Sequence, residues 1–156
     1  MTLVEPAEIA YERVFAEHWS DVFRFALAWT NDWGAAEDLA QDAFLRLWDH
    51  RERLDWSRSV VPWLLVATRR LATDRFRRLR KVLGGTGVSA EADESIRARW
   101  LDVRVAMDRL SSLERTALVM TALEGLTYDE AATVLGTSAG ALRAAVSRAR
   151  TKLETA

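Results

Sequence analysis

The thirteen residues from Arg69 to Lys81 carry seven basic side chains and one acidic one, in a chain whose formal net charge is only -1. Like charges three and four residues apart on a helix repel one another unless an external partner compensates them. Arginine outnumbers lysine 20 to 2 in the chain, and guanidinium groups form bidentate contacts with phosphate and guanine. The run therefore predicts a surface that binds a polyanion, with nucleic acid as the expected partner.

The charges alternate along the chain in blocks. Residues 1–49 hold 3 basic and 10 acidic side chains, residues 50–81 hold 10 and 3, residues 82–130 hold 5 and 9, and residues 131–156 hold 4 and 1. Two basic blocks, each preceded by an acidic one, predict two contacts with a polyanion and separate surfaces for other partners.

Composition limits the class of protein. With 156 residues, 49% hydrophobic and 29% charged, the chain is expected to be globular, with one ordinary domain or two small ones. It has no cysteine, which excludes disulfides and thiolate zinc sites. The N-terminus is acidic where a signal peptide would be basic, and the most apolar run, Val60 to Thr68, is too short for a membrane span. We expect a cytoplasmic protein without membrane insertion.

The sequence has no residue pattern typical of catalysis. His18 and His50 are lone histidines, and no Gly-x-Ser-x-Gly motif occurs. The segment from Gly84 to Gly87 lacks the following lysine and helix start that a phosphate-binding loop requires. We expect no enzyme activity, no catalytic residue, no metal site and no cofactor.

Helices are predicted throughout, because only two prolines occur, the glycines gather at breaks, and no sustained period-two alternation is present. Asn31 and Asp32 can cap the second helix, and Pro62 suits the first residue of the third. Capping boxes are expected at Ser111 with Glu114 and at Thr127 with Glu130. The expected helices cover residues 6–29, 33–50, 62–81, 96–110, 112–125, 128–135 and 138–153.

These elements predict an all-α fold of two small helical domains joined by a flexible linker. The linker is placed at residues 83–95, which are glycine-rich and then acidic. Domain boundaries of 1–82 and 96–156 follow. In the second domain, a short helix, a turn at Gly136 and a longer helix form the pattern of a helix-turn-helix unit, which any helical hairpin can resemble.

The helix before the first basic block has two different faces at 100° per residue. One face is ordinary core: Leu39, Ala40, Ala43, Phe44 and Leu47. The opposite face carries Asp38, Gln41, Asp42, Leu45 and Asp49. From the pattern alone, its leucine is either a scattered surface residue or the centre of a docking patch that selects a basic partner.

The basic helix divides in the same way. Its expected core face is Leu64, Ala67, Thr68, Leu71 and Ala72. The opposite stripe holds Arg69, Arg70, Thr73, Arg77 and Arg80. A charged stripe is often only a solvated face, but such faces usually mix signs, and Asp74 is the only acid in this run. This stripe is therefore expected to contact phosphate.

Several segments of the chain resemble conserved regions of the extracytoplasmic-function (ECF) sigma factors of the sigma-70 family, and they occur in the same order along the chain. Residues 37–48 look like the polymerase-binding region 2.2, and residues 63–64 with 69–78 resemble regions 2.3 and 2.4. Residues 108–115, 124–132, 135–138 and 147–150 are similar to region 4. The resemblance covers about residues 10–81 and 100–153.

The resemblance implies a protein that binds core RNA polymerase, directs it to promoter DNA and helps to open the duplex. It favours the docking interpretation of the acidic face, with contacts from Asp38, Gln41, Asp42, Leu45 and Trp48. It also implies a minus-10 contact made by Trp56, Trp63, Arg69, Arg70, Thr73, Asp74, Arg77 and Arg80. The loop at residues 55–60 would capture an unstacked base, where Trp56 would either stack on that base or pack beneath the loop.

The last helix would contact the minus-35 element through Ser138, Gly140, Arg143, Ala144, Ser147, Arg148 and Arg150. Ala141 and Ala145 stand where the family commonly has a threonine and an arginine, so few side chains can hydrogen-bond to base edges. We expect contact through phosphate, the helix N-terminus and DNA shape instead. Arg70 stands where the family often has asparagine, which leaves the minus-10 base preference open.

The family is usually held by an anti-sigma factor, which is therefore an expected partner. Two other hypotheses remain. A non-sigma helix-turn-helix regulator would explain residues 125–150 but neither the acidic docking helix nor the linker. A degenerate sigma-like interaction protein would explain Ala141 and Ala145. The promoter, the regulon and the inducing signal do not follow from the sequence.

Overall fold

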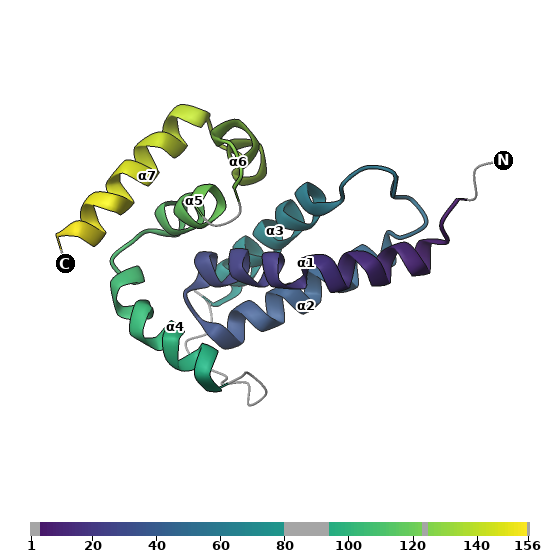
Figure 1. The fold of residues 1–156 in the computed structure, drawn as a ribbon, viewed down its shortest axis with the longest axis horizontal. Coiled ribbons are helices and arrows are strands. Elements are labelled where there is room, and N and C mark those ends of the chain that lie inside the picture. Colours follow the sequence, from purple (N-terminus) through teal and green to yellow (C-terminus); the bar gives the residue numbers. More distant parts are fainter. Residues whose placement is uncertain (1–3, 80–93, 123–124, 156) are drawn as a thin grey trace.

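The computed structural model describes residues 4–79, 94–122 and 125–155, and all regular structure in those ranges is helical (Figure 1). The predicted all-α fold is confirmed. The helices are α1 (Ala7–Thr30), α2 (Trp33–Asp49), α3 (Val61–Leu79), α4 (Glu94–Met107), α5 (Ser112–Ala122), α6 (Tyr128–Leu135) and α7 (Ala139–Glu154). The predicted linker falls largely outside the described residues, and α4 begins two residues before the expected start of the fourth helix.

The N-terminal helices pack as expected from their apolar faces. Asp32 caps α2 by accepting a hydrogen bond from the Ala35 backbone N–H at 2.9 Å, and Asn31 ends α1 in the left-handed conformation with φ 49°. Asparagine tolerates this conformation better than most residues. The predicted core face of α2 is buried, and on α3 Leu64, Ala67, Thr68 and Ala72 are buried and Leu71 is half-buried.

Both predicted capping boxes are present. Ser111 Oγ accepts from the Glu114 N–H at 3.1 Å while the Glu114 carboxylate accepts from the Ser111 N–H at 2.8 Å. The same reciprocal pair joins Thr127 and Glu130 at the start of α6. Gly136 ends α6 with φ 66°, a backbone conformation that side chains rarely adopt. The helix-turn-helix therefore consists of α6, the turn at Gly136 and α7.

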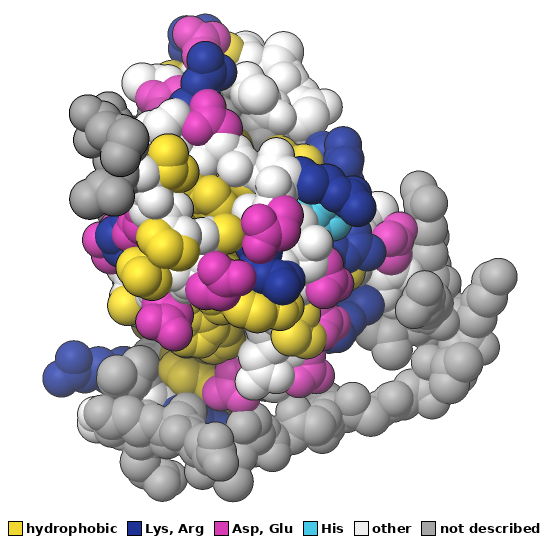
Figure 2. Space-filling view, turned by 90° about the vertical axis from the view of Figure 1, so that its right-hand side faces the viewer, with side chains coloured by type: hydrophobic (Ala, Val, Ile, Leu, Met, Phe, Trp, Pro, Cys, Tyr) yellow, Lys and Arg dark blue, Asp and Glu magenta, His cyan; other side chains and the backbone are white. Residues whose placement is uncertain are grey.

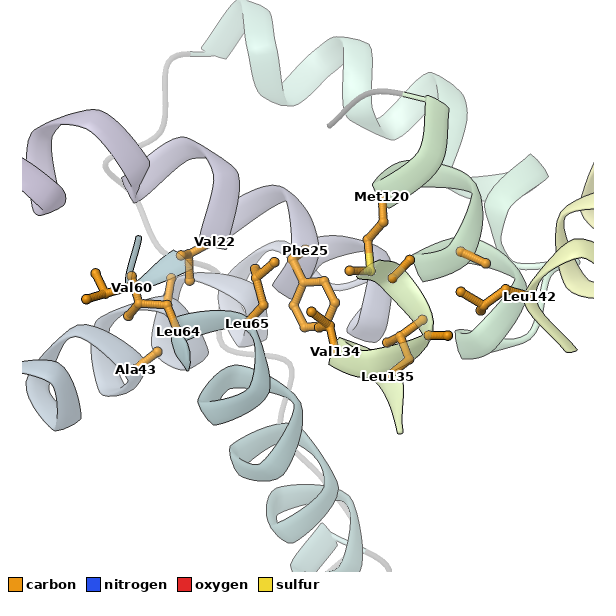
Figure 3. Packing of buried hydrophobic residues seen from close by; sticks show 14 of the residues in the cluster. Val22, Phe25, Ala43, Val60, Leu64, Leu65, Met120, Val134, Leu135 and Leu142 are labelled. Carbon is orange, nitrogen blue, oxygen red and sulfur yellow. The ribbon is translucent and has the colours of Figure 1, made fainter. Parts of the chain in front are cut away.

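The two helical regions share one hydrophobic cluster (Figure 3). Phe25 of α1 and Leu65 of α3 belong to the same cluster as Met120 of α5 and Val134 of α6. Phe25 is 1% exposed, and truncating such a buried aromatic to alanine typically costs about 3–5 kcal/mol. The regions predicted as separate domains thus pack directly on each other.

Candidate polymerase and nucleic-acid interfaces

The predicted polymerase-docking face lies on the exposed side of α2. Leu45 is 60% exposed, although it lies directly beside the fully buried Phe44. Asp38, Gln41 and Asp49 are also exposed. An exposed leucine surrounded by carboxylates is apolar at its centre and acidic at its rim, which fits a partner of the opposite charge. Figure 2 shows one face of the molecule, on which hydrophobic, acidic and basic side chains are interspersed.

Two carboxylates of this face, Asp42 and Asp38, share a partner in the chain. The Asp42 carboxylate accepts a hydrogen bond from Arg75 of α3, and Arg75 also lies 3.9 Å from Asp38. Arg75 was not singled out by the sequence pattern, since its partners lie 33 and 37 positions earlier. One cation of the basic run therefore bridges the basic helix to the docking helix.

Trp48, also predicted to contact polymerase, is half-buried. Its ring meets Tyr11 edge to face at a centroid distance of 5.0 Å, and the Arg51 guanidinium carbon lies 4.0 Å from the Trp48 ring centroid. Aromatic pairs of this geometry and cation–π contacts each contribute about 0.5–1 kcal/mol or more. Trp48 is therefore held on α1 and on the turn that follows α2.

The exposed face of α3 presents only part of the predicted minus-10 set. Arg70 and Asp74 are exposed, and the Thr73 hydroxyl donates to the Arg69 carbonyl at 2.9 Å. Arg69 is half-buried, because its guanidinium lies against the backbone of Gly136 in the helix-turn-helix. Arg77 lies in α3 but its side chain is outside the described set, and Arg80 lies outside the described residues.

The loop before α3 borders a cavity of about 240 Å³, lined by Arg13, Val14, His18, Trp56, Ser57, Arg58, Ser59 and Val60. Trp56 donates its indole N–H to the Arg51 carbonyl at 2.8 Å and packs on the hydrophobic cluster, while its ring also lines the cavity. Hydrogen bonds from the Ser57 hydroxyl and N–H, followed by the charge of Arg58, lower the pKa of Asp55. Trp63 is half-buried, with its ring centroid 5.3 Å from that of His50.

The outward face of α7 carries the residues predicted for the minus-35 contact. All seven are exposed: Ser138, Gly140, Arg143, Ala144, Ser147, Arg148 and Arg150. Ser138 is the N-cap of α7 and accepts from the Ala141 N–H at 3.1 Å. Ala145 is fully buried. Packing therefore requires a small side chain at this position. Ala145 is then weaker evidence for the hypothesis of a degenerate sigma-like interaction protein.

Two cations on this face also have partners within the protein. Arg148 Nε lies 3.5 Å from the Glu114 carboxylate, which is 2% exposed, and the Arg143 guanidinium carbon lies 5.3 Å from the Tyr128 ring centroid. Burial alone would raise the pKa of Glu114, but hydrogen bonds from Lys152 and Ser111 and the Lys152 charge lower it to about 2. The sequence predicted Glu114 as a cap but not as the anion that holds α7.

No helix among the described residues is both long and apolar enough to span a membrane. Within the same residues, no three metal-ligating side chains converge to form a cation site.

The fold and these faces define a two-region helical protein with a helix-turn-helix. Two segments of the chain match known protein families. Residues 14–82 match Sigma-70 region 2, and residues 100–153 match Sigma-70, region 4. The chain therefore belongs to the sigma-70 family, as an ECF RNA polymerase sigma factor that directs transcription initiation.

Individual proteins similar to this chain are also sigma factors. The chain is 36% identical over 154 residues to the probable RNA polymerase sigma factor RfaY of Xanthomonas campestris pv. campestris, covering 90% of this chain but only 38% of that protein. It is 34% identical over 140 residues to the ECF sigma factor SigC of Mycobacterium tuberculosis, covering 85% of this chain and 75% of the relative. It is 31% identical to the sigma factor CarQ of Myxococcus xanthus over 157 residues, with 94% and 88% covered.

Two solved structures share the fold. The sigma factor RpoE of Bartonella quintana, in complex with the anti-sigma factor NepR, matches with a TM-score of 0.77 at 23% identity, covering 93% of this chain and 94% of that one. CnrH in complex with the cytosolic domain of CnrY matches with a TM-score of 0.68 at 24% identity, covering 95% and 87%.

Proposed function

We propose that the exposed face of α2 docks this sigma factor on core RNA polymerase. The observation that carries the proposal is Leu45, a large apolar side chain left 60% exposed between Gln41 and Asp49, which are also exposed. Leu45 supplies apolar contact, and Asp38 and Asp49 select a basic partner surface. Trp48 extends the contact area at its edge. Asp42 contributes mainly by fixing α2 to α3 through Arg75.

The minus-10 contact belongs to α3 and the loop before it. Arg70 is exposed and free to contact phosphate. The cavity beside Trp56 offers an aromatic wall and two arginines, Arg13 and Arg58. This combination suits an unstacked base and its phosphate, since bases stack on aromatic rings and cations bind the backbone.

The minus-35 contact belongs to α7, and its chemistry is dominated by phosphate. The outward residues Gly140, Ala144 and Ser147 are small, so they allow close approach but donate few hydrogen bonds to bases. The N-terminus of α7 adds a partial positive charge that favours phosphate. Direct base recognition is therefore expected to be weaker here than on α3.

The protein acts in the cytoplasm, where polymerase and promoter DNA are found, and an anti-sigma factor is its expected regulator. Support for such a partner comes from the fold shared with RpoE and CnrH, both solved in complexes with partners. No partner is identified by the chain itself.

Run-off transcription from a promoter library, with core polymerase and the purified protein, tests the proposal. Sequencing of the transcript starts should give one consensus with two elements upstream of each start. Transcription that does not depend on the protein, together with retained DNA binding, would favour the non-sigma regulator instead.

A further inference from the structure

The two carboxylate oxygens of Glu114 have different partners. Oε1 accepts a hydrogen bond from the Ser111 N–H at 2.8 Å and another from the Lys152 ammonium at 2.7 Å. Oε2 lies nearest to Arg148, whose Nε is 3.5 Å away. Lys152 and Arg148 are four residues apart on α7, so their side chains are neighbours on one side of that helix. One carboxylate therefore faces two cations of the helix proposed to contact minus-35 DNA.

These two cations are held to different degrees. The Lys152 contact of 2.7 Å is a short hydrogen bond between two charged groups. The Arg148 contact of 3.5 Å is longer than the usual N–H···O distance of about 2.7–3.2 Å, and the Arg148 side chain is 55% exposed. Lys152 is thus paired within the protein, whereas Arg148 remains largely in solvent.

Glu114 requires a cation at this position. Its side chain is 2% exposed. Burial alone would raise its pKa, but the hydrogen bonds from Lys152 and Ser111 lower it to about 2, so the carboxylate is ionised at neutral pH. A buried charge that loses its partner is strongly destabilising. If Lys152 were absent, a shift of less than about 1 Å would bring Arg148 Nε into hydrogen-bond range of the carboxylate.

The opposite side of α7 carries cations without such an anion. Arg143 and Arg150 lie roughly 140–160° around the helix from Arg148 at 100° per residue, and both are exposed. The Arg143 guanidinium carbon lies 5.3 Å from the Tyr128 ring centroid, a contact that leaves its charge uncompensated. In the described part of the chain, carboxylate partners are found for Arg148 and Lys152 but not for these two arginines. The two sides of α7 therefore differ in the charge they offer to DNA.

We propose that Glu114 is a positioning residue of the minus-35 contact: it keeps the charge of Lys152 within the protein and so leaves Arg148 as the cation that this side of α7 offers to phosphate. The inference rests on the proposed function of α7. Each cation that contacts phosphate adds about 0.9 to the salt slope of DNA binding. Glu114 therefore sets how strongly α7 is attracted to DNA of any sequence, although it is buried itself.

Glu114→Gln, Lys152→Met and the combination of the two separate this role from a purely structural one. Glu114→Gln releases Lys152 and adds one available cation. Lys152→Met leaves Glu114 charged, so Arg148 is drawn to the carboxylate and one available cation is lost. In the double variant the anion and its partner are both absent, and Arg148 is available again.

Glu130→Gln is the matched control for the change of charge. Glu130 caps α6 in the same reciprocal way as Glu114 caps α5. It is exposed, and it has no cationic partner among the described residues. Its replacement therefore removes a carboxylate of the same region without releasing a cation of α7.

The test titrates the full chain with a fluorescent duplex of arbitrary sequence over a salt series that starts at low salt, and circular dichroism checks that each variant is folded. Glu114→Gln should bind about five- to tenfold more tightly than the wild type at low salt, with a salt slope steeper by about 1. Lys152→Met should bind more weakly by a similar factor, with a slope shallower by about 1. The double variant and Glu130→Gln should stay within about twofold of the wild type.

Loss of stability alone would weaken the binding of Glu114→Gln, so the sign of its effect separates the two roles. Weaker or unchanged binding by Glu114→Gln would overturn the inference, as would a wild type that does not bind the duplex. A double variant as weak as Lys152→Met would also overturn it, since Lys152 would then contact DNA itself. These titrations contain no polymerase. If the proposed function fails, no form of the chain binds core polymerase, yet the signs of the three salt slopes still decide the role of Glu114.

Discussion

The Lys152 ammonium lies 2.7 Å from the Glu114 carboxylate, which is 2% exposed at the start of α5. The same carboxylate caps α5 through the Ser111 N–H and approaches Arg148 at 3.5 Å. One buried anion therefore begins a helix of the second region and also attaches α7, the helix proposed to contact DNA, to that region.

This relationship predicts an acid-sensitive second region. Burial alone would raise the pKa of Glu114, but the hydrogen bonds from Lys152 and Ser111 lower it from 4.5 to about 2. A depressed folded-state pKa adds stability that is fully present above about pH 4.5 and is lost as the pH falls towards 2. Glu114→Gln keeps a capping side chain but should lower the free energy of unfolding at pH 7 by about 2 kcal/mol and flatten its dependence over that pH range.

Chemical denaturation at pH 7 and pH 3 measures this difference. Glu130→Gln in the exposed capping box of α6 is the matched control and should change stability by less than about 0.5 kcal/mol. Equal pH dependence for the wild type and Glu114→Gln would contradict the role of the buried ion pair.

Two arginines of α3 should behave differently when replaced by alanine. Arg70 is exposed and proposed to contact phosphate, so Arg70→Ala should weaken duplex binding and reduce the salt slope by about 1 without loss of stability. Arg75 pairs with Asp42, so Arg75→Ala should lower stability by about 1 kcal/mol and leave the salt slope unchanged. Thermal unfolding and a salt titration of both variants measure the contrast; similar effects from the two would refute the division of roles.

Adjacent alanines of α7 offer a second matched pair. Ala145 is fully buried and Ala144 is exposed. Ala145→Arg forces a charge and extra volume into the core and should destabilise the protein by more than about 3 kcal/mol. Ala144→Arg should leave stability within about 0.5 kcal/mol and strengthen duplex binding through a new phosphate contact. Urea unfolding and duplex titration of each variant test this; a fully stable Ala145→Arg protein would contradict the described packing.

The small outward residues of α7 predict weak base recognition at the minus-35 element. Scrambling the bases of that element, once the promoter is known, should cost the holoenzyme no more than about 3 kcal/mol of affinity, the loss typical of one or two mismatches. Competition binding with intact and scrambled duplexes provides the measurement. A larger loss would show that α7 recognises bases directly.

The sequence predicted the local structure well because helix caps and apolar periodicity depend on neighbours in the chain. The cap at Asp32, both capping boxes and the buried faces of α2 and α3 are examples. It did not predict that Arg75 pairs with Asp42, 33 positions away, or that Arg115 donates to the carbonyls of Ala28 and Trp29, 87 and 86 positions away. Such pairs leave no periodic signal. Arg69 was expected on the exposed basic stripe of α3, but the turn at Gly136 packs against its side chain. This contact also joins residues far apart in the chain and could not be seen in the sequence pattern.

The double variant Asp38→Arg with Leu45→Ala removes an acid and the apolar centre of the α2 face. Its affinity for core RNA polymerase tests most directly whether this chain is a sigma factor that docks through α2. The control combines Asp102→Arg with Val105→Ala, an acid and an apolar residue that are also exposed but lie on α4. We expect the α2 double variant to lose polymerase binding by at least about a hundredfold while its circular dichroism is unchanged, because a charge reversal and an apolar truncation at an interface centre each cost about 2 kcal/mol or more. The control should bind as the wild type does. Unchanged affinity of the α2 variant would contradict docking through α2.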